Sequence, residues 1–326
     1  MTAVKKSSTT KPDFNQLNEM VIGIPPETVE YISQAHTLYT TGLSPVDRPI
    51  GASLSCGPTG VGKTRTVECV AELIHGSTKN LLRIDCGEFQ LEHDVAKLVG
   101  APPGYLGHRE TPPILTQQRL SAITSERSNM SIILFDEIEK SAPSMVRLLL
   151  GMLDRAMLKT GDNVNVNFER TLFFFTSNIG SSYFNKTGMG FDSSSGYSSA
   201  IRNVNAMLKK KFPPEFLGRI DEIFIYHPLT SEEIDDIIYM EIQKLESHVI
   251  LRLGINAPDE IKITTRLKNQ IASVTNLDAG ARDVGRKINR LIGLKISKML
   301  AENKAVFERK KIVCDWIKDE VKINVN

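Results

Sequence analysis

Several features that would mark a specialised class of protein are missing from this sequence. No apolar run in the 326 residues approaches the roughly 18 residues that a membrane-spanning helix requires. No apolar stretch follows the basic N-terminus, which excludes an ordinary secretory signal. The four cysteines form no CxxC pair and the six histidines no HExxH pair, so we expect reduced, buried thiols and no zinc site. These absences predict a cytoplasmic protein with no membrane partner.

An excess of charge of either sign is also lacking. The chain has 40 Lys and Arg against 38 Asp and Glu, a net charge of +2. A chain so near neutrality has no general attraction to nucleic acid, and no recognition-helix or zinc motif is found. We therefore predict no nucleic-acid partner and disfavour a motor that acts on nucleic acid. Its length and 41% hydrophobic residues allow one large domain or two smaller ones, each with a core.

Short apolar segments alternate with amphipathic segments over the first two thirds of the sequence. A continuous apolar run, as at Ser131–Asp136, is typical of a strand that is buried on both faces. Strands that alternate with helices indicate an α/β fold with a parallel sheet. We predict a helix over 64–74 and strands over 52–56, 81–85, 131–136, 172–176 and 222–226.

The pattern changes after Pro228. We expect a polar, mobile tail over 1–15, a large nucleotide-binding domain over 16–228 and a small, mainly helical domain over 229–326. The Ser/Gly-rich stretch 188–199 is predicted to be a mobile loop. No internal repeat is found. The small domain is predicted to have helices over 231–251 and 281–303 and strands near 260–263 and 320–325.

A glycine-rich motif lies between the first predicted strand and the first predicted helix. It runs through Gly57, Pro58, Thr59, Gly60, Val61, Gly62, Lys63 and Thr64, with the spacing GxxxxGK[ST]. Backbone N–H groups of such a loop surround phosphate oxygens, and the helix that follows adds its positive N-terminal end. We expect Lys63 to reach the β- and γ-phosphates and the Thr64 hydroxyl to bind Mg²⁺. The motif therefore predicts ATP and Mg²⁺ as cofactors.

Two carboxylates follow the buried strand that ends at residue 136. Asp136 is expected to hold Mg²⁺ directly or through water. Glu137 is expected to polarise the attacking water as a general base. The alternative is an acidic pair that merely ends a strand at the surface. The phosphate-binding motif upstream favours the catalytic interpretation.

These motifs and three more occur in one order along the chain. They are GPTGVGKT at 57–64, FDEIEK at 135–140, TSNIG at 176–180, PEFLGRID at 214–221 and GAR at 280–282. Together they resemble the AAA+ ATPases of the Clp unfoldase family. The match is best to the second ATPase module of the double-ring members ClpA, ClpB and ClpC, and extends from Val21 nearly to the C-terminus. The resemblance implies a three-layer P-loop AAA+ domain with a parallel sheet and a small helical C-terminal lid.

The resemblance also implies roles for residues near the phosphate loop. Val21 and Ile22 correspond to the segment that contacts adenine, although the family's usual Gln is replaced by Ile24. Asn178 matches the first sensor, which helps to place the attacking water. Without the resemblance, Asn178 would be interpreted as an ordinary turn residue at the end of a strand.

Two arginines gain roles only from the resemblance. Arg219 matches the arginine finger, which enters the neighbouring subunit's site and stabilises charge on the γ-phosphate. Arg282 matches the second sensor, on the small domain. Each would otherwise be interpreted as half of a surface ion pair. The finger requires a neighbour, and the family assembles as hexamers, so a homohexamer is implied.

A segment at 102–108 resembles the family's pore loop. Tyr105 and Leu106 lie between two glycines, where an aromatic ring could grip an extended protein chain. The alternative is an ordinary Pro/Gly turn. The segment 158–162 lies where a second pore loop would fall but departs from its pattern, and 109–113 replaces a Gly-rich link.

The predicted mobile loop contains a further short match. Met189, Gly190 and Phe191 are similar to the tripeptide with which protease-coupled members dock onto a ClpP-type peptidase. Docking and a disordered or locally packed loop stay open as alternatives. The short N-terminal segment implies that a partner or adaptor delivers the client, that the ring has one dedicated client, or that the chain is a fragment.

The leading hypothesis is an ATP-hydrolysing ring motor that unfolds, threads or remodels protein clients. The alternative is a nucleotide-gated binding module that remodels one dedicated partner without processive translocation.

Overall fold

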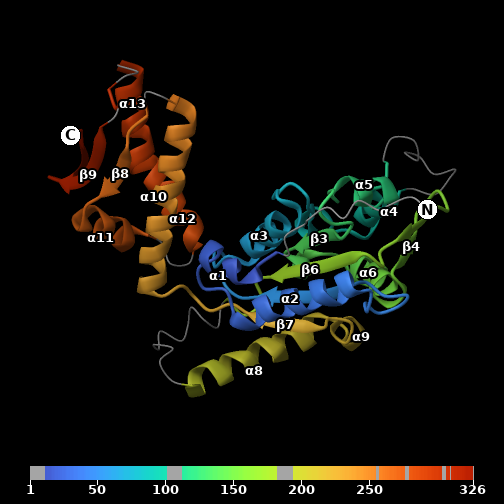
Figure 1. The fold of residues 1–326 in the computed structure, drawn as a ribbon. Helices are drawn as coiled ribbons and strands as arrows, with labels where there is room; N and C mark the ends of the chain where they lie inside the picture. Colours follow the sequence, from blue (N-terminus) through green and yellow to red (C-terminus); the bar gives the residue numbers. More distant parts are fainter. Residues whose placement is uncertain are drawn as a thin grey trace. The chain divides into compact units, whose positions relative to one another are not determined.

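The computed structural model describes residues 12–100, 112–181, 194–254, 257–275, 279–302, 306–308 and 310–325. The chain divides into two compact units (Figure 1). The first comprises Met1–Pro58 and Gly62–Tyr226, and the second comprises Thr59–Val61 and His227–Asn326. Within the described part of the chain, no helix is both long and apolar enough to cross a membrane.

A five-stranded sheet is the centre of the first unit. Its order is β2-β3-β6-β1-β7 and every neighbouring pair is parallel. The predicted α/β class with a parallel sheet is confirmed, and each predicted strand is present to within one residue at either end. The strands are β1 (Gly51–Cys56), β2 (Leu82–Asp85), β3 (Ser131–Asp136), β6 (Thr171–Ser177) and β7 (Glu222–Ile225).

Helices cover both faces of this sheet because successive side chains of a strand point to opposite faces. On β3, Ile132 and Leu134 pack in one buried cluster, whereas Ile133 and Phe135 pack in another. The first cluster includes residues of α1 (Leu17–Met20), α2 (Pro26–Thr41) and α3 (Lys63–His75). The second includes residues of α6 (Pro143–Arg155), α8 (Ser194–Lys211) and α9 (Pro214–Leu217). The result is a three-layer α/β fold.

Two predictions at the margins of the first unit are wrong in part. The tail expected over 1–15 extends too far, because η1 (Phe14–Gln16) is a 3-10 turn with the Asp13 side chain as its cap and with Phe14 buried. The loop expected over 188–199 overlaps α8, which begins at Ser194. The serines suggested a loop, but α8 continues into Ala200, Val204 and Leu208, which are spaced four residues apart and buried.

Shorter elements complete the first unit, and several of them were not predicted. α2 was missed, although Pro26 at its start and Gly42 in the left-handed region at its end are ordinary boundary signals. The remaining elements are η2 (Cys86–Glu88), η3 (Glu92–Val95), α4 (Ala96–Val99), α5 (Gln117–Ala122), η4 (Ile138–Lys140) and the hairpin of β4 (Met157–Lys159) with β5 (Asn165–Asn167).

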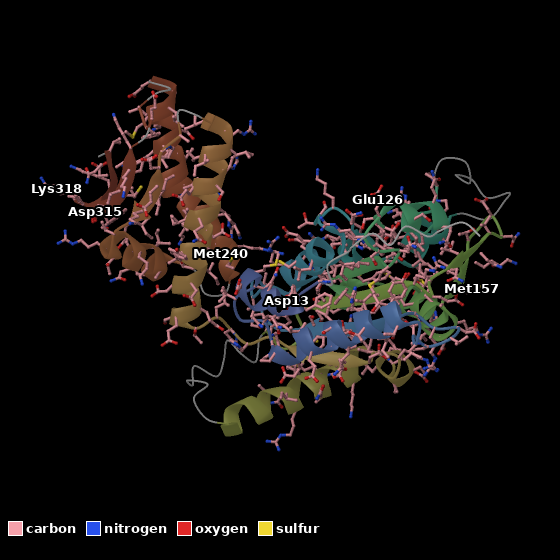
Figure 2. All side chains as sticks on the ribbon, viewed as in Figure 1. Asp13, Glu126, Met157, Met240, Asp315 and Lys318 are labelled. Carbon is pink, nitrogen blue, oxygen red and sulfur yellow. The ribbon has the colours of Figure 1, made fainter. Side chains whose placement is uncertain are left out.

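The second unit combines helices with a three-stranded sheet of order β10-β9-β8. β9 (Lys311–Ile317) was not predicted; it pairs in parallel with β8 (Glu260–Ile263) and forms a hairpin with β10 (Glu320–Val325). Figure 2 labels Asp315 and Lys318 at this hairpin. The helices are α10 (Ser231–Leu253), α11 (Thr265–Val274), α12 (Ala281–Ile288) and α13 (Leu294–Glu302).

The helix predicted over 281–303 is not regular along its length. A π-helical turn, η7 (Asn289–Gly293), separates α12 from α13. Such a turn occurs mostly as a short interruption of an α-helix. Hydrophobic periodicity continued through it, with Val284, Ile288, Ile292 and Ile296 all buried, so the sequence pattern did not mark the interruption.

Candidate nucleotide site

The phosphate-binding motif begins directly after β1, between two neighbouring strands. β1 pairs with β6 on one side and with β7 on the other. The strands are parallel, so Cys56, Asp136 and Ser177 all end at one edge of the sheet. Ligands of open parallel sheets bind outside this carboxyl edge. Within the first unit, the fold therefore collects both ends of the predicted phosphate loop, the acidic pair and the first sensor at this edge of the sheet.

Glycine is required in the loop for its backbone conformation. Gly57, Gly60 and Gly62 have φ angles of 144°, 80° and 102°, in the region that side-chain-bearing residues avoid. A Cβ atom on Gly62 would lie 2.9 Å from Cγ1 of Val21, and one on Gly57 would lie 2.4 Å from the carbonyl oxygen of Tyr226. The loop therefore has both the conformation and the close packing that the glycines were predicted to provide.

Lys63 is the first residue of α3 and its side chain turns back over the loop. Its Nζ donates to the carbonyl oxygens of Gly57 at 2.7 Å and Pro58 at 2.6 Å, and to Oδ1 of Asn178 at 3.0 Å. The residue is 7% exposed, and a buried ammonium needs such acceptors. These contacts hold a positive charge beside the loop, where a phosphate group would be attracted to it.

Asp136 lies at the end of β3 and its carboxylate accepts hydrogen bonds from three donors. The donors are the Thr64 hydroxyl at 3.2 Å from Oδ1, the Thr176 hydroxyl, and Nη2 of Arg83 at 2.5 Å from Oδ2. The hydroxyl of Thr64 and the carboxylate of Asp136 thus lie side by side, and Mg²⁺ prefers oxygen ligands of this kind.

The protein alone would not complete a magnesium shell here. No group of three or more His, Cys, Asp or Glu side chains that could hold a metal occurs within the ranges described above. Mg²⁺ usually binds through one or two protein oxygens and takes its other ligands from phosphates and water. The pair Thr64 and Asp136 fits an ion of this kind, bound together with a nucleotide.

Glu137 is held in an unusual backbone conformation next to Asp136. Its φ is 57°, in the left-handed region, and its N–H donates to the Thr176 hydroxyl at 3.0 Å. Its Oε1 accepts from Nδ2 of Asn178 at 3.0 Å, and its Oε2 accepts from Nζ of Lys140. The left-handed conformation costs about 1–2 kcal/mol for a non-glycine residue. Here it turns the carboxylate toward Asn178.

The amide of Asn178 joins the two halves of the site. Its Oδ1 accepts from Lys63, while its Nδ2 donates to Glu137, each at 3.0 Å. The backbone N–H of Asn178 donates to Oε1 of Glu139 at 3.0 Å, which anchors the turn after β6. One side chain therefore contacts both the phosphate-side cation and the candidate base.

Two groups beside the site have shifted pKa values. The hydrogen bond to Glu137 is the main cause that raises the pKa of Lys140, so this amine stays charged as a partner of the carboxylate. Burial raises the pKa of the Cys56 thiol, at the end of β1, to about 12. Cys56 is therefore a packing residue, since a reactive cysteine needs a thiolate near neutral pH.

Arg219 lies near the amino-terminal ends of the parallel strands, whereas the phosphate loop of the same chain follows their carboxyl-terminal ends. Two residues later, the N–H of Asp221 donates to the carbonyl of Ala52 at 2.8 Å, near the start of β1. The loop follows the other end of β1, whose six residues span roughly 20 Å at 3.3 Å each. An arginine side chain cannot cover that distance, so Arg219 does not reach the loop within one chain.

The remaining predicted site residues fall into three groups. Val21 is 2% exposed and packs in the core, with Ile22 following it, so its side chain is not free to face a ligand. Arg282 lies on α12 of the second unit. Tyr105 and Leu106, and likewise Met189, Gly190 and Phe191, lie outside the described residues.

Three side chains in the site were not predicted. Thr176 and Lys140 lie inside quoted motifs, but neither motif indicates that they bind the two carboxylates. Arg83 lies on β2, whose neighbour in the sheet is β3, and the register places Asp85 beside Asp136. An arginine two residues before the end of an adjacent strand is a signal only once the strand order is known.

Comparison with known proteins identifies the family of this arrangement. A family model described as AAA domain (Cdc48 subfamily) matches residues 48–223. The chain belongs to this AAA family. The matched residues of the AAA domain begin just before β1 and end within β7, so they include the phosphate loop, the acidic pair, Asn178 and Arg219.

The chain that contains this AAA domain is also similar to proteins named "ATP-dependent Clp protease ATP-binding subunit ClpC". It is 35% identical over 314 residues to that of Staphylococcus aureus (strain USA300), and 33% identical over 314 residues to that of Staphylococcus epidermidis (strain ATCC 12228 / FDA PCI 1200). Each match covers 95% of this chain and 37% of the relative. The chain thus spans little more than a third of the length of these relatives. The resemblance to Clp-type AAA+ ATPases is confirmed, and it supports ATPase activity.

Proposed function

We propose that the chain hydrolyses Mg²⁺-bound ATP and uses the energy as a Clp-type chaperone or unfoldase acting on protein clients. The connection from Lys63 through Asn178 to Glu137 is the observation that carries the hydrolysis part. These contacts join a cation suited to phosphate with a carboxylate suited to orient water. The membership of the AAA family and the similarity to ClpC support the same activity.

Each residue of the site has a proposed task. The backbone of 57–62 and Lys63 bind the phosphates, and Thr64 and Asp136 hold Mg²⁺, whose charge offsets the negative charge of the reaction. Glu137 accepts a proton from the attacking water, which Asn178 helps to position. Val21 and Ile22 form the backbone segment beside the base, and Arg282 on the small C-terminal lid responds to nucleotide.

The chain is proposed to work as a ring, with six copies as the expected number. The separation of Arg219 from its own phosphate loop supports this proposal. An arginine at the far edge of the sheet can stabilise developing phosphate charge only in a neighbouring subunit. In such an assembly, one surface of each chain contacts a different surface of the following chain. Head-to-tail contacts of this kind can close into a ring.

Substitution of Arg219 by alanine tests the ring. Arg219→Ala is expected to lower kcat on the order of a thousandfold while ATP still binds, because the residue acts on the transition state in another subunit. Equal mixing with Glu137→Gln, whose Arg219 is intact, is expected to restore part of the ATPase activity. A loss of ATP binding, or a mixture that is no more active than its components, would contradict a role in the neighbouring site.

The pulling action is proposed on the sequence of the pore segment. Tyr105 and Leu106 are expected to grip the client, so Tyr105→Ala should stop client unfolding while ATPase activity persists. If unfolding is unchanged, the threading proposal is wrong. Slow hydrolysis that unfolded protein does not stimulate would instead favour a nucleotide-gated binding module.

Coupling to a ClpP-type peptidase, or to an adaptor, is a separate proposal. It depends on Met189, Gly190 and Phe191. A pull-down with Glu137→Gln should retain ATP-bound assemblies together with their client and any peptidase. If Phe191→Ala retains the same peptidase in such a pull-down, the tripeptide is not its docking site.

A further inference from the structure

Among the residues that the structure describes, the side chain of Arg219 has one partner. Its Nε donates to Oδ1 of Asp154, in the last turn of α6. Arg219 follows α9, and α6 and α9 are in contact (Figure 1). The two side chains are 39% and 35% exposed, so the pair lies at the surface. A partly exposed ion pair contributes at most about 1 kcal/mol to stability. Its effect on the orientation of the guanidinium is therefore the larger consequence.

The geometry of this pair leaves the outer end of the guanidinium free. The hydrogen bond to Asp154 is made by Nε, and among the described residues no hydrogen bond is found for either Nη nitrogen. A guanidinium is planar and rigid, so one bond at Nε restricts the direction in which both Nη groups point. The two Nη groups together can bind two phosphate oxygens in a bidentate manner.

The backbone that carries Arg219 is fixed independently of Asp154. Oδ2 of Asp221 accepts from the N–H of Ala52 at 2.7 Å and from the Tyr31 hydroxyl at 3.1 Å. Burial is the main cause that raises the pKa of Tyr31, so its hydroxyl remains a donor. With the segment fastened to β1 in this way, the side-chain torsions of Arg219 are the freedom left for Asp154 to restrict.

We propose that Asp154 is a positioning residue for Arg219, which aims the two Nη groups at the phosphates bound by the neighbouring subunit. This inference rests on the proposed function of Arg219 in the next subunit. It identifies Asp154 as the residue that restricts the side-chain conformation of Arg219 before the neighbouring subunit binds. Less conformational entropy is then lost when the arginine meets the transition state.

The test compares Asp154→Ala and Asp154→Asn with a matched control. Glu92→Ala removes the carboxylate of another exposed ion pair to the same helix, Glu92 with Arg147 at 3.3 Å. Asp154→Ala is expected to lower kcat of the assembled ATPase by about ten- to a hundredfold, the range expected for a misplaced catalytic group. KM for ATP and the affinity for a fluorescent ADP should change less than about twofold, since Asp154 does not touch the phosphate loop of its own chain. Asp154→Asn keeps an oxygen acceptor, so its kcat is expected to lie between those of the wild type and Asp154→Ala. The kcat of Glu92→Ala is expected to equal that of the wild type.

Mixed assemblies separate this inference from the proposed function. Asp154→Ala mixed with Glu137→Gln should regain activity, whereas Asp154→Ala mixed with Arg219→Ala should not, because both defects lie on the arginine side. If Arg219→Ala itself leaves hydrolysis unchanged, the proposed function fails. If Arg219→Ala abolishes hydrolysis but Asp154→Ala keeps the wild-type kcat, only the positioning role is overturned. The same conclusion follows if mixing with Arg219→Ala restores the activity of Asp154→Ala.

Discussion

Arg83 and Asp136 form an ion pair at the carboxylate that is proposed to hold Mg²⁺. Nη2 of Arg83 lies 2.5 Å from Oδ2 of Asp136, and the Asp136 side chain is only 8% exposed. A buried carboxylate without a cation is costly, and Arg83 offsets the charge of Asp136. Two cations then compete for one carboxylate, which has a measurable consequence.

We expect Arg83→Ala to make the protein less stable alone and more responsive to magnesium nucleotide. Loss of the pair should lower the unfolding free energy by ~1–2 kcal/mol. The loss is limited because the Arg83 side chain is itself about half exposed. Thermal unfolding with ADP should show a larger rise in Tm on adding Mg²⁺ than in the wild type. Arg147→Ala, at an exposed pair, is the control. An unchanged Mg²⁺-dependent rise would exclude competition.

Asn178→Asp should separate the two contacts of the bridging amide. An aspartate still accepts from Lys63 but cannot donate to Glu137, and it adds a negative charge beside that carboxylate. We expect kcat to fall on the order of a hundredfold, a loss typical for a preorganised polar group, with ADP affinity retained. Asn80→Asp, at an amide that bonds to backbone carbonyls, is the control for a general effect on folding. Full activity of Asn178→Asp would show that the contact with Glu137 is dispensable.

Gly62→Ala should impair nucleotide binding more than it impairs the fold. The φ of 102° is strained for alanine, and the added Cβ would meet Val21 at 2.9 Å. The loop must therefore shift, and the affinity for ADP is expected to fall at least about tenfold, since one lost backbone contact to phosphate is worth ~1.5 kcal/mol. Calorimetric titration with ADP measures it. Gly151→Ala, on α6 with open space around its Cβ position, should bind as the wild type.

His75 should make the fold sensitive to mild acid. Burial is the main cause that lowers its pKa from 6.5 to about 4, and Nδ1 is paired with the Ser125 hydroxyl. The unfolded chain takes up the proton first, near pH 6.5, so the stability due to neutral His75 is complete above that pH and is lost toward pH 4. On the order of 2 kcal/mol should be lost between pH 7 and 5.

The measurement for His75 is a comparison of urea unfolding at the two pH values. His75→Gln keeps a polar side chain but does not titrate, so its unfolding free energy should fall less between pH 7 and 5 than that of the wild type. His248, which lies on α10 of the second unit, provides the control substitution His248→Gln. Parallel pH slopes for wild type and His75→Gln would contradict the argument.

The sequence predicted the sheet better than the helices that cover it. A strand buried on both faces is a continuous apolar run, and the runs at β3 and β6 are bounded by polar residues. α2 was missed because its buried residues, such as Val29 and Ile32, lie among polar ones without a strong stripe. β9 was missed because Asp315 interrupts its apolar residues.

The candidate site was predicted as a set of segments, not as a set of contacts. Local spacing identifies Lys63, at the start of a helix, and Asp136, at the end of a strand, whereas Asn178 was assigned only through the family resemblance. Local spacing does not indicate that one amide contacts both Lys63 and Glu137. It also does not indicate Asp154, which lies 65 positions before Arg219. Contacts of that kind depend on strand order and on side-chain rotamers, which have no local pattern.

The six-residue length of β1 has one more consequence for the proposed assembly. The strand holds the phosphate loop and Arg219 apart, so each chain has one face that receives an arginine and another that gives one. An open arc of such chains always has one fewer complete site than it has members, because the terminal loop faces no arginine. Closure supplies the missing site without any new chain. ATP turnover per chain should therefore increase as arcs lengthen and reach its maximum when the ring closes. Dilution of the protein would then slow ATP hydrolysis at concentrations where nucleotide is still bound.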